Sequence, residues 1–411
     1  MENRAKQDRY WFYFEPYVYK VNKKDKTLLY NTLDGRHIEI SDKQLQDFVE
    51  LVYQKENLGV VEIDKQLLDN AQYSTFFSEL KKKYIGDFFE VSETKPIQLM
   101  PILNLQKDID RLKRGEIEAT GEGVLSYLSE LTLFINESCQ KACQNCTWYA
   151  KQASCCTCKK DSNSELDVTY IKNIVSQVEQ VNPRLNITGG NILTYSQWPA
   201  LLSFLSSYKN DVYIWIHYSN IAEASALPIE LSKLAIPITF PVNKKELKKC
   251  MELTSLHNPT FYCYITSEEE YYSAEGLEKE YGWKNYRILP IFTGNNIEFF
   301  QKYVFTDREE LFDTAVSIRK IFMHQSVNTN FFGKLTILPD GTIKANLNTP
   351  ALGNINKNSM LEIIDYELNS SNAWRSTRSL EPCASCLYQY LCASPSSYEI
   401  VMSKPNLCTI S

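Results

Sequence analysis

Apolar and polar residues alternate in short runs over the first part of the chain. Two turn-forming segments separate three such runs, which predict an antiparallel meander: 16–21, 27–31 and 36–40. The segment Ser41–Gln44 has the pattern of a capping box, and apolar residues at helical spacing follow it. A strand at 59–63, two short helices and a strand at 88–91 complete a small α+β unit that we predict to be a domain over 1–95.

From about residue 130 the pattern changes to strand-like apolar runs that alternate with helical ones. The strand-like runs are 130–136, 184–188, 212–218, 236–240, 259–266 and 285–291. Between them, apolar residues recur every three or four positions, as at Ile171, Ile174, Val175 and Val178. Sustained alternation of this kind predicts an α/β fold built on a parallel sheet or a partial barrel. Before it, 96–128 contains prolines, glycines and a charged run, and we predict a linker there.

Composition narrows the class of protein. The 411 residues are 44% hydrophobic and 23% charged, which is typical of a globular chain. The net charge of −6 provides no basic field for duplex nucleic acid. No apolar run approaches a transmembrane helix, and the N-terminus does not resemble a secretory signal. We therefore expect a cytoplasmic protein with no nucleic-acid or membrane partner. Phosphate-loop, HExxH and GxSxG motifs are absent from the sequence.

Cysteine is the most informative residue type. There are 12 cysteines, and they fall mainly in two patches, at 139–158 and 383–408. Clustered thiols in a reducing compartment are typical ligands of metals or clusters. Cys250 and Cys263 lie in apolar surroundings and are predicted to be buried. The four histidines show no metal-binding spacing, so we assign none of them a role.

The first patch begins with Cys139, Cys143 and Cys146, directly after the first strand of the α/β region. Three thiolates on a loop at the carboxyl end of a strand can ligate three irons of a [4Fe–4S] cluster and leave the fourth iron open. A structural zinc site is the alternative, although such sites usually supply four ligands.

This CxxxCxxC spacing resembles the radical S-adenosylmethionine (SAM) superfamily, whose fold is a partial (βα)6 barrel. The resemblance implies that the open iron binds SAM and that one electron cleaves SAM to a 5′-deoxyadenosyl radical. The segment Gly189-Gly190-Asn191 is similar to the family's GGE segment, which lines the methionyl amino group, and glycines there allow close approach. We also expect SAM contacts from Thr239, at the end of a predicted strand, although that strand end lacks the family's ribose motif. Trp148 or Tyr149 could replace the aromatic residue that the family has where this chain has Asn145, and we predict Trp148 as the contact.

The second patch is Cys383, Cys386, Cys392 and Cys408, and it resembles the SPASM domain of peptide-modifying radical SAM enzymes. The resemblance implies that these four cysteines hold one auxiliary [4Fe–4S] cluster within a domain at 331–411, beyond a barrel at 129–330. A second auxiliary cluster would need cysteines where this chain has Asn346 and Ser396, so we expect it to be absent. A four-cysteine zinc site is the alternative.

Two further segments, TWYAKQASCC and WRSTRSLEPCASCLYQYLC, resemble the pseudo-radical-SAM SPASM branch found with double-glycine-leader natural-product precursors. The N-terminal unit then resembles winged-helix elements that bind leader peptides by adding the leader to a sheet edge. A purely structural extension is the alternative. The resemblance implies two partners, a precursor peptide and an electron donor such as a flavodoxin or ferredoxin. A second maturase is a further candidate partner.

Cys155, Cys156 and Cys158 follow the first motif, and we predict a local catalytic role for them. They could be extra cluster ligands, redox or hydrogen-donor thiols, or loop residues without a role. Two positions depart from the family. Asn145 stands where an aromatic residue is usual, and Asn191 replaces a glutamate, so it cannot neutralise an ammonium group.

The sequence thus predicts a radical SAM enzyme that modifies a ribosomally synthesised precursor peptide, by cross-linking, epimerisation or thioether formation. The rival hypothesis is a catalytically degenerate iron–sulfur SPASM protein that binds the precursor and presents it to a partner maturase. A third hypothesis is a zinc protein, in which both cysteine groups hold zinc.

Overall fold

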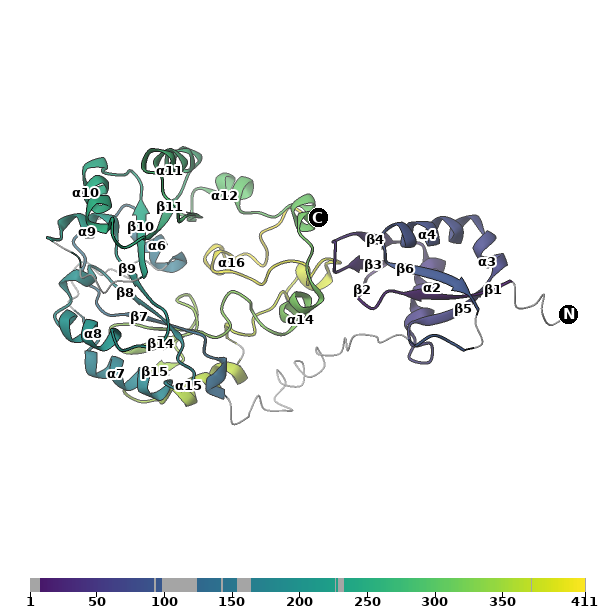
Figure 1. The fold of residues 1–411 in the computed structure, drawn as a ribbon, viewed down its shortest axis with the longest axis horizontal. Coiled ribbons are helices and arrows are strands. Elements are labelled where there is room, and N and C mark those ends of the chain that lie inside the picture. Colours follow the sequence, from purple (N-terminus) through teal and green to yellow (C-terminus); the bar gives the residue numbers. More distant parts are fainter. Residues whose placement is uncertain are drawn as a thin grey trace.

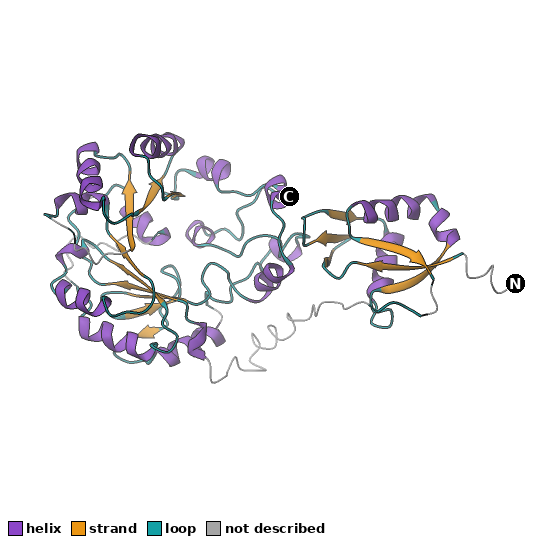
Figure 2. Cartoon of the chain, viewed as in Figure 1, coloured by secondary structure: helices purple, strands orange, loops and turns teal. Residues whose placement is uncertain are grey.

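The computed structural model describes residues 8–91, 94–97, 124–141, 143–153, 164–225, 227, 233–370 and 372–410. A small N-terminal unit and a larger α/β body form the molecule, as Figures 1 and 2 show. Most of the predicted linker and all of Cys155, Cys156 and Cys158 lie outside the described residues.

Within its described residues, the N-terminal unit contains two three-stranded sheets and three helices. The sheet orders are β5-β1-β6 and β2-β3-β4. The elements are β1 (Arg9–Phe14), β2 (Val18–Lys23), β3 (Lys26–Asn31), β4 (His37–Ile40), α2 (Lys43–Tyr53), β5 (Val60–Asp64), α3 (Lys65–Asp69), α4 (Ala71–Lys82) and β6 (Gly86–Glu90). The predicted meander is therefore confirmed as β2-β3-β4.

Two local features of this unit differ from the sequence prediction. Strand β1 was not predicted, because its aromatic run RYWFYF has no polar alternation to reveal a strand. In the structure, Phe12 and Phe14 fill the core of the unit. The helix cap is Asp42 rather than Ser41, since the Asp42 carboxylate accepts a hydrogen bond from the backbone N–H of Leu45 at 3.0 Å.

The body is built on one nine-stranded sheet in the order β12-β11-β10-β9-β8-β7-β13-β14-β15. Six strands of this sheet pair in parallel with one another in chain order. They are β7 (Glu130–Phe134), β8 (Arg184–Thr188), β9 (Val212–Trp215), β10 (Lys233–Thr239), β11 (Thr260–Ile265) and β12 (Tyr286–Pro290). All six had been predicted as strands. Because consecutive parallel strands adjoin, their carboxyl ends share one edge of the sheet.

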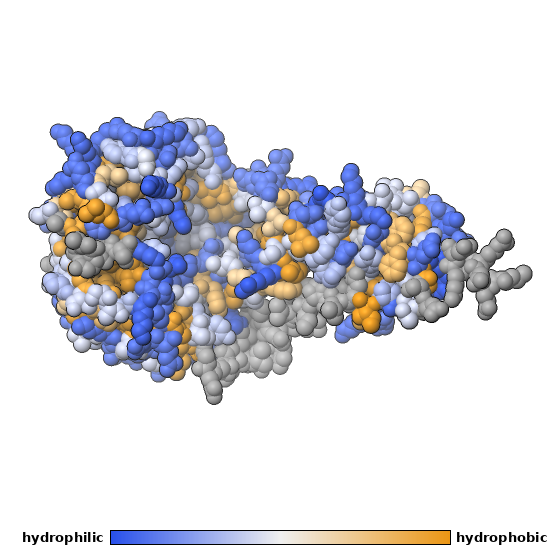
Figure 3. Space-filling view, in the orientation of Figure 1, coloured by the Kyte–Doolittle hydropathy of each residue, from blue (hydrophilic) through white to orange (hydrophobic). Residues whose placement is uncertain are grey.

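Helices join these parallel strands and flank the sheet. They are α6 (Cys146–Gln152), α7 (Val168–Gln177), α8 (Trp198–Leu205), α9 (Tyr218–Glu223), α10 (Lys244–Thr254), α11 (Glu268–Tyr281), α12 (Ile297–Tyr303), α13 (Arg308–Asp313) and α14 (Ile318–Ser326). The outer faces of α10 and α11 are strongly hydrophilic, as the blue rim in Figure 3 shows. Within the core, Cys250 and Cys263 are fully buried, as predicted.

The sheet continues past residue 330, where the sequence suggested a domain boundary. Strand β13 (Lys334–Ile337) pairs in parallel with β7, and two short antiparallel strands follow it, β14 (Thr342–Lys344) and β15 (Gly353–Asn354). The remaining helices are α15 (Met360–Ser370) and α16 (Ser397–Met402), with 3-10 turns at Val124–Tyr127, Ile192–Thr194 and Cys383–Ser385. In the described part of the chain, no helix combines the length and apolar character that a bilayer span needs.

The N-terminal unit packs against the C-terminal part of the body through an apolar cluster. Tyr19, Leu28 and Tyr30 supply its side of the contact, opposite residues that include Val316 and Tyr388. The Tyr30 hydroxyl accepts a hydrogen bond from the backbone N–H of Val316 at 2.8 Å. The sheet β2-β3-β4 therefore has one face in its own core and the other against the body.

Candidate cofactor sites

The first cysteine group lies on the loop after β7, at the shared carboxyl edge of the parallel strands. Cys139, Cys143 and Cys146 are half-buried, and all three pack around a small apolar cluster that contains Tyr149 and Tyr264. Cys146 is the first residue of α6, so the helix orients its side chain.

The three thiols are close enough to influence one another's charge. Burial raises the pKa of Cys146 to about 11, and the neighbouring Cys143 and Cys139 add to that rise. Burial and then Cys139 also raise the pKa of the Cys143 thiol. A cation or cluster that bound here would remove this mutual repulsion, because thiolates are stabilised by a bound metal.

Gly189 and Gly190 follow β8 and lie directly against the start of the cysteine loop. The backbone N–H of Gly190 donates to the carbonyl oxygen of Asn136 at 3.1 Å and to its Oδ1 at 3.0 Å. The Asn136 amide in turn donates to the carbonyl of Asn191 at 2.9 Å. A side chain on Gly190 would overlap the backbone of Ser138. These glycines therefore permit a close backbone contact that positions the loop carrying Cys139.

Both glycines also line a small cavity together with Cys139 and Cys143. The predicted SAM contact Asn191 is not among the residues that line it. Its Oδ1 accepts a hydrogen bond from the backbone N–H of Leu193 at 3.2 Å and caps the short turn at Ile192–Thr194.

The other two predicted SAM contacts lie in different surroundings. Thr239, at the end of β10, hydrogen-bonds to Cys143 through its hydroxyl. Trp148 packs edge-on against Phe292, with ring centroids 5.8 Å apart, and a Cβ atom at Gly294 would lie 3.1 Å from its ring. The structure thus brings Thr239 to the cysteine loop. Trp148 lies against the segment after β12 and packs on the same apolar cluster as the three cysteines.

His217 is a site residue that the sequence reasoning missed. It follows β9, caps α9 and lines the cavity. Its Nε2 lies 3.0 Å from the Thr239 hydroxyl, and its Nδ1 lies 2.7 Å from the Ser219 hydroxyl. Burial lowers its pKa to about 4, and the nearby Lys141 acts in the same direction. The neutral ring therefore links β9 to β10 beside Cys143. Only its place at the carboxyl end of a strand could have pointed to it.

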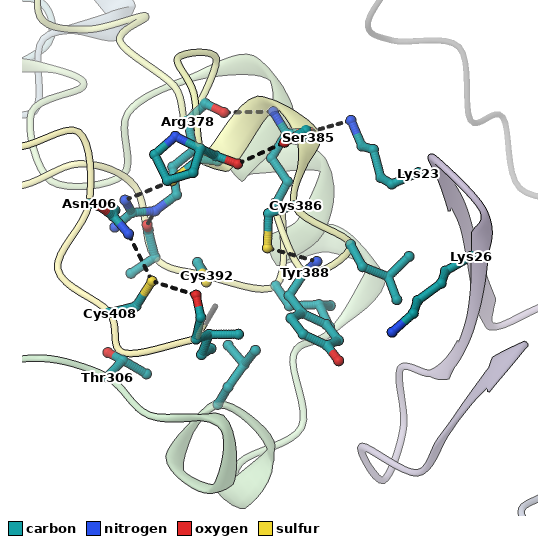
Figure 4. A pocket seen from close by; sticks show the side chains of 18 of the residues that line it. Lys23, Lys26, Thr306, Arg378, Ser385, Cys386, Tyr388, Cys392, Asn406 and Cys408 are labelled. Carbon is teal, nitrogen blue, oxygen red and sulfur yellow. Dashed lines mark hydrogen bonds between the residues drawn. The ribbon is translucent and has the colours of Figure 1, made fainter. Parts of the chain in front are cut away.

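The second cysteine group is brought together by the fold. Cys383, Cys386, Cys392 and Cys408 all line one cavity of about 610 Å³, three of them labelled in Figure 4. Burial raises the pKa of Cys392 to about 12, and Arg378 opposes that effect. The four thiols interact electrostatically with one another.

Polar groups point at these sulfurs. The Asn406 amide donates to Cys408 Sγ at 3.0 Å, and the backbone N–H of Tyr388 donates to Cys386 Sγ at 3.4 Å. The Arg378 guanidinium lies 3.9 Å from Cys383 Sγ and forms a buried ion pair with Glu399 at 2.9 Å. Hydrogen bonds to cysteine sulfurs are a main determinant of the potential of an iron–sulfur cluster.

The cysteine side chains of each group do not converge on a single position. Across the ranges that the structure describes, no three His, Cys, Asp or Glu side chains converge closely enough to hold a metal ion. At the two positions where a second auxiliary cluster would need cysteines, Asn346 donates to the Ser397 hydroxyl at 3.0 Å and Ser396 caps α16.

No protein-family model and no curated protein matches the chain. Among solved structures, the chain is similar to Streptococcus suis SuiB, with a TM-score of 0.43, 13% identity, and coverage of 96% of this chain and 98% of that chain. For SuiB bound to the precursor peptide SuiA the TM-score is 0.40 at 13% identity, with coverage of 97% and 98%. For SuiB bound to S-adenosylmethionine the TM-score is 0.40 at 13% identity, with coverage of 96% of this chain and 97% of that chain. These scores are too low to transfer a function.

Proposed function

We propose that this chain is a radical SAM enzyme that modifies a ribosomally synthesised precursor peptide, with a partial (βα)6 barrel and a SPASM-type auxiliary cluster. The observation that carries the proposal is the presence of two separate cysteine groups, each gathered at one place in the fold. The triplet lies at the carboxyl edge of the parallel strands, and the quartet lines one cavity.

Cys139, Cys143 and Cys146 would hold the first cluster. When bound, a cluster with one open iron supplies the electron that cleaves SAM. The chain's own residues position this loop in three ways. Gly190 and Asn136 hold it against β8, Thr239 hydrogen-bonds to Cys143, and Lys141 forms an ion pair with Glu223 of α9. The buried rings of Tyr149 and Tyr264 exclude water from the side of the loop that they cover.

Cys383, Cys386, Cys392 and Cys408 would hold the auxiliary cluster. A cavity of about 610 Å³ suits a group of many atoms better than a single zinc ion, whose four sulfur ligands each lie about 2.3 Å from the metal. The sulfur-directed donors Asn406, Tyr388 and Arg378 fit thiolates that share negative charge with a cluster.

The N-terminal unit would bind the leader of the precursor peptide. In the described residues, strands β2 and β4 are the outer strands of one sheet, and β5 and β6 those of the other. An outer strand presents backbone groups to which an extended peptide can add. Docking of the leader there would raise the effective concentration of the rest of the precursor peptide near the α/β body.

A second candidate function is a degenerate protein that binds the precursor peptide and presents it to a partner maturase. The observation that favours it is the role of Asn191, which caps a turn and does not line the cavity beside Cys139. In this case the clusters would be structural.

Anaerobic reconstitution followed by a SAM-cleavage assay tests the proposal. Brown protein with about eight irons per chain, which releases 5′-deoxyadenosine under strong reductant, supports it. Release should be lost in Cys143→Ala and retained in Cys250→Ala, whose thiol is buried away from both sites. Iron without SAM cleavage, even with precursor peptide present, would favour the degenerate protein, and colourless zinc-loaded protein would contradict both candidates.

A further inference from the structure

We propose that Lys23 of the N-terminal unit is a positioning residue of the auxiliary cluster site and raises the reduction potential of the cluster bound there. This inference rests on the proposed function, because it assumes a cluster on the C-terminal cysteine quartet. It adds that a residue more than 350 positions away in the sequence belongs to that site.

The turn between β2 and β3 reaches over the four-cysteine cavity, and Figure 4 shows Lys23 and Lys26 approaching it from these strands. The Lys23 ammonium donates to the carbonyl oxygen of Ala384 at 2.7 Å and to Oε1 of Gln389 at 3.0 Å. Ala384 directly follows Cys383. Lys23 therefore holds both halves of the loop that carries Cys383 and Cys386.

Gln389 extends this contact toward the sulfurs. Its side chain is buried, and its amide donates to the carbonyl oxygen of Arg378 at 2.6 Å. The Arg378 guanidinium in turn lies 3.9 Å from Cys383 Sγ. A chain of contacts thus runs from Lys23 through Gln389 and Arg378 to one of the proposed cluster ligands.

The charge of Lys23 is not compensated in the way that the charge of Arg378 is. Arg378 is ion-paired with Glu399, whereas both hydrogen-bond acceptors of Lys23 are neutral oxygens. Among the described residues, no carboxylate lies within ion-pair distance of Lys23. Other charged side chains also line the cavity, and these are Lys24, Asp25, Lys26, Glu39 and Glu310. Glu39 is already paired with Arg308.

Lys23 is also half-buried, so water screens its charge less than that of an exposed lysine. Its ammonium lies 2.7 Å from the carbonyl oxygen of Ala384, the residue after Cys383, so the charge is held beside the cysteine loop. Reduction adds one negative charge to a cluster held by four thiolates. A nearby cation stabilises the reduced form more than the oxidised form and so raises the potential.

The test is a redox titration followed by electron paramagnetic resonance. The parent is the full chain with Cys139, Cys143 and Cys146 all changed to Ala, which leaves the auxiliary cluster as the only signal. Lys23→Gln removes the charge and keeps a hydrogen-bond donor, and Lys23→Arg keeps the charge. Lys43→Met is the matched control, because Lys43 belongs to the same unit but is exposed and paired with Asp47.

At the midpoint of the parent, the ratio of reduced to oxidised cluster in Lys23→Gln should be several-fold lower, up to about tenfold, which corresponds to a fall of ~59 mV in the potential. Lys23→Arg and Lys43→Met should stay near the parent. Loss of iron in Lys23→Gln with retention in Lys23→Arg would also support the positioning role. An unchanged potential in Lys23→Gln, or loss of iron in both Lys23 variants, would overturn this inference and leave the proposed auxiliary cluster standing. A parent without iron at this site would overturn the proposed auxiliary cluster and the inference with it.

Discussion

A Cβ atom at Gly190 would lie 2.1 Å from the carbonyl oxygen of Ser138. The backbone after β8 is thus in direct contact with the start of the loop that carries Cys139. Gly189 shows the same crowding, since its Cβ would lie 2.5 Å from Oδ1 of Asn136. The glycine pair therefore has a structural role in placing the cysteine loop, whichever ligand the loop holds.

Gly190→Ala should displace this loop. We expect the free energy of unfolding of the apoprotein to fall by about 1–3 kcal/mol, the usual effect of overpacking, and iron binding at the first site to drop. Urea denaturation and iron analysis measure both quantities. Gly276→Ala in α11 is the control, because nothing lies within 4 Å of its Cβ position and alanine favours a helix. Equal effects of the two substitutions would contradict this role of Gly190.

The iron content of variants tests the assignment of the auxiliary ligands. Cys383→Ala or Cys408→Ala should lose about four irons per chain and leave the first cluster in place. Asn346→Ala should leave the iron content unchanged, because Asn346 hydrogen-bonds to Ser397 rather than to a thiol. A loss of about two irons, or none, from the cysteine variants would show that the ligand set is wrong.

The stability of the apoprotein should depend on pH through His217. Its folded-state pKa is about 4, below the ~6.5 of an unfolded histidine, so the unfolded chain binds more protons between these values. Stability is therefore fully present above pH ~6.5 and falls as the pH is lowered toward 4. Because the ring is only partly shielded from solvent, we expect roughly 1–2 kcal/mol.

His217→Asn should flatten this dependence, since asparagine can still cap α9 but does not titrate. Denaturation curves of the parent and the variant, recorded from pH 7.5 to pH 4.5, give the difference directly. Parallel curves over that range would contradict the prediction.

The isolated N-terminal fragment 1–95 should bind the leader of the cognate precursor with an affinity in the roughly nanomolar-to-micromolar range. It has its own apolar core, which includes Phe12, Phe48 and Phe77, and so should fold alone. Calorimetry with the leader and with a scrambled leader measures the binding.

Without this unit, the chain should keep SAM cleavage and lose peptide modification. Modification by the truncated chain, with no binding by the fragment, would reduce the unit to a structural extension.

The truncated chain needs a structural control. Removing the unit uncovers apolar side chains of the body such as Val316 and Tyr388, and it also removes Lys23 from the cavity. The SAM-cleavage rate and the iron content of the truncated chain should therefore be measured before its peptide modification is judged.

Local signals in the sequence determined much of this protein. Periodicity identified the six parallel strands and the meander β2-β3-β4, because alternation along a short segment directly reflects which face is buried. It failed for β1, where aromatic residues occupy both faces of the strand. Cysteine spacing identified both groups of candidate ligands, because ligands from one loop must be close in sequence.

Tertiary structure alone decided the contacts between distant segments. The pairing of β13 with β7, the contact of His217 with Thr239, and the contact of Lys23 with Ala384 all join residues far apart along the chain. It also decided that the Asn191 side chain caps a turn, although the motif suggested a ligand contact. No local pattern encodes such contacts, since they depend on how whole elements pack, and packing is set by the complete apolar core rather than by any one segment.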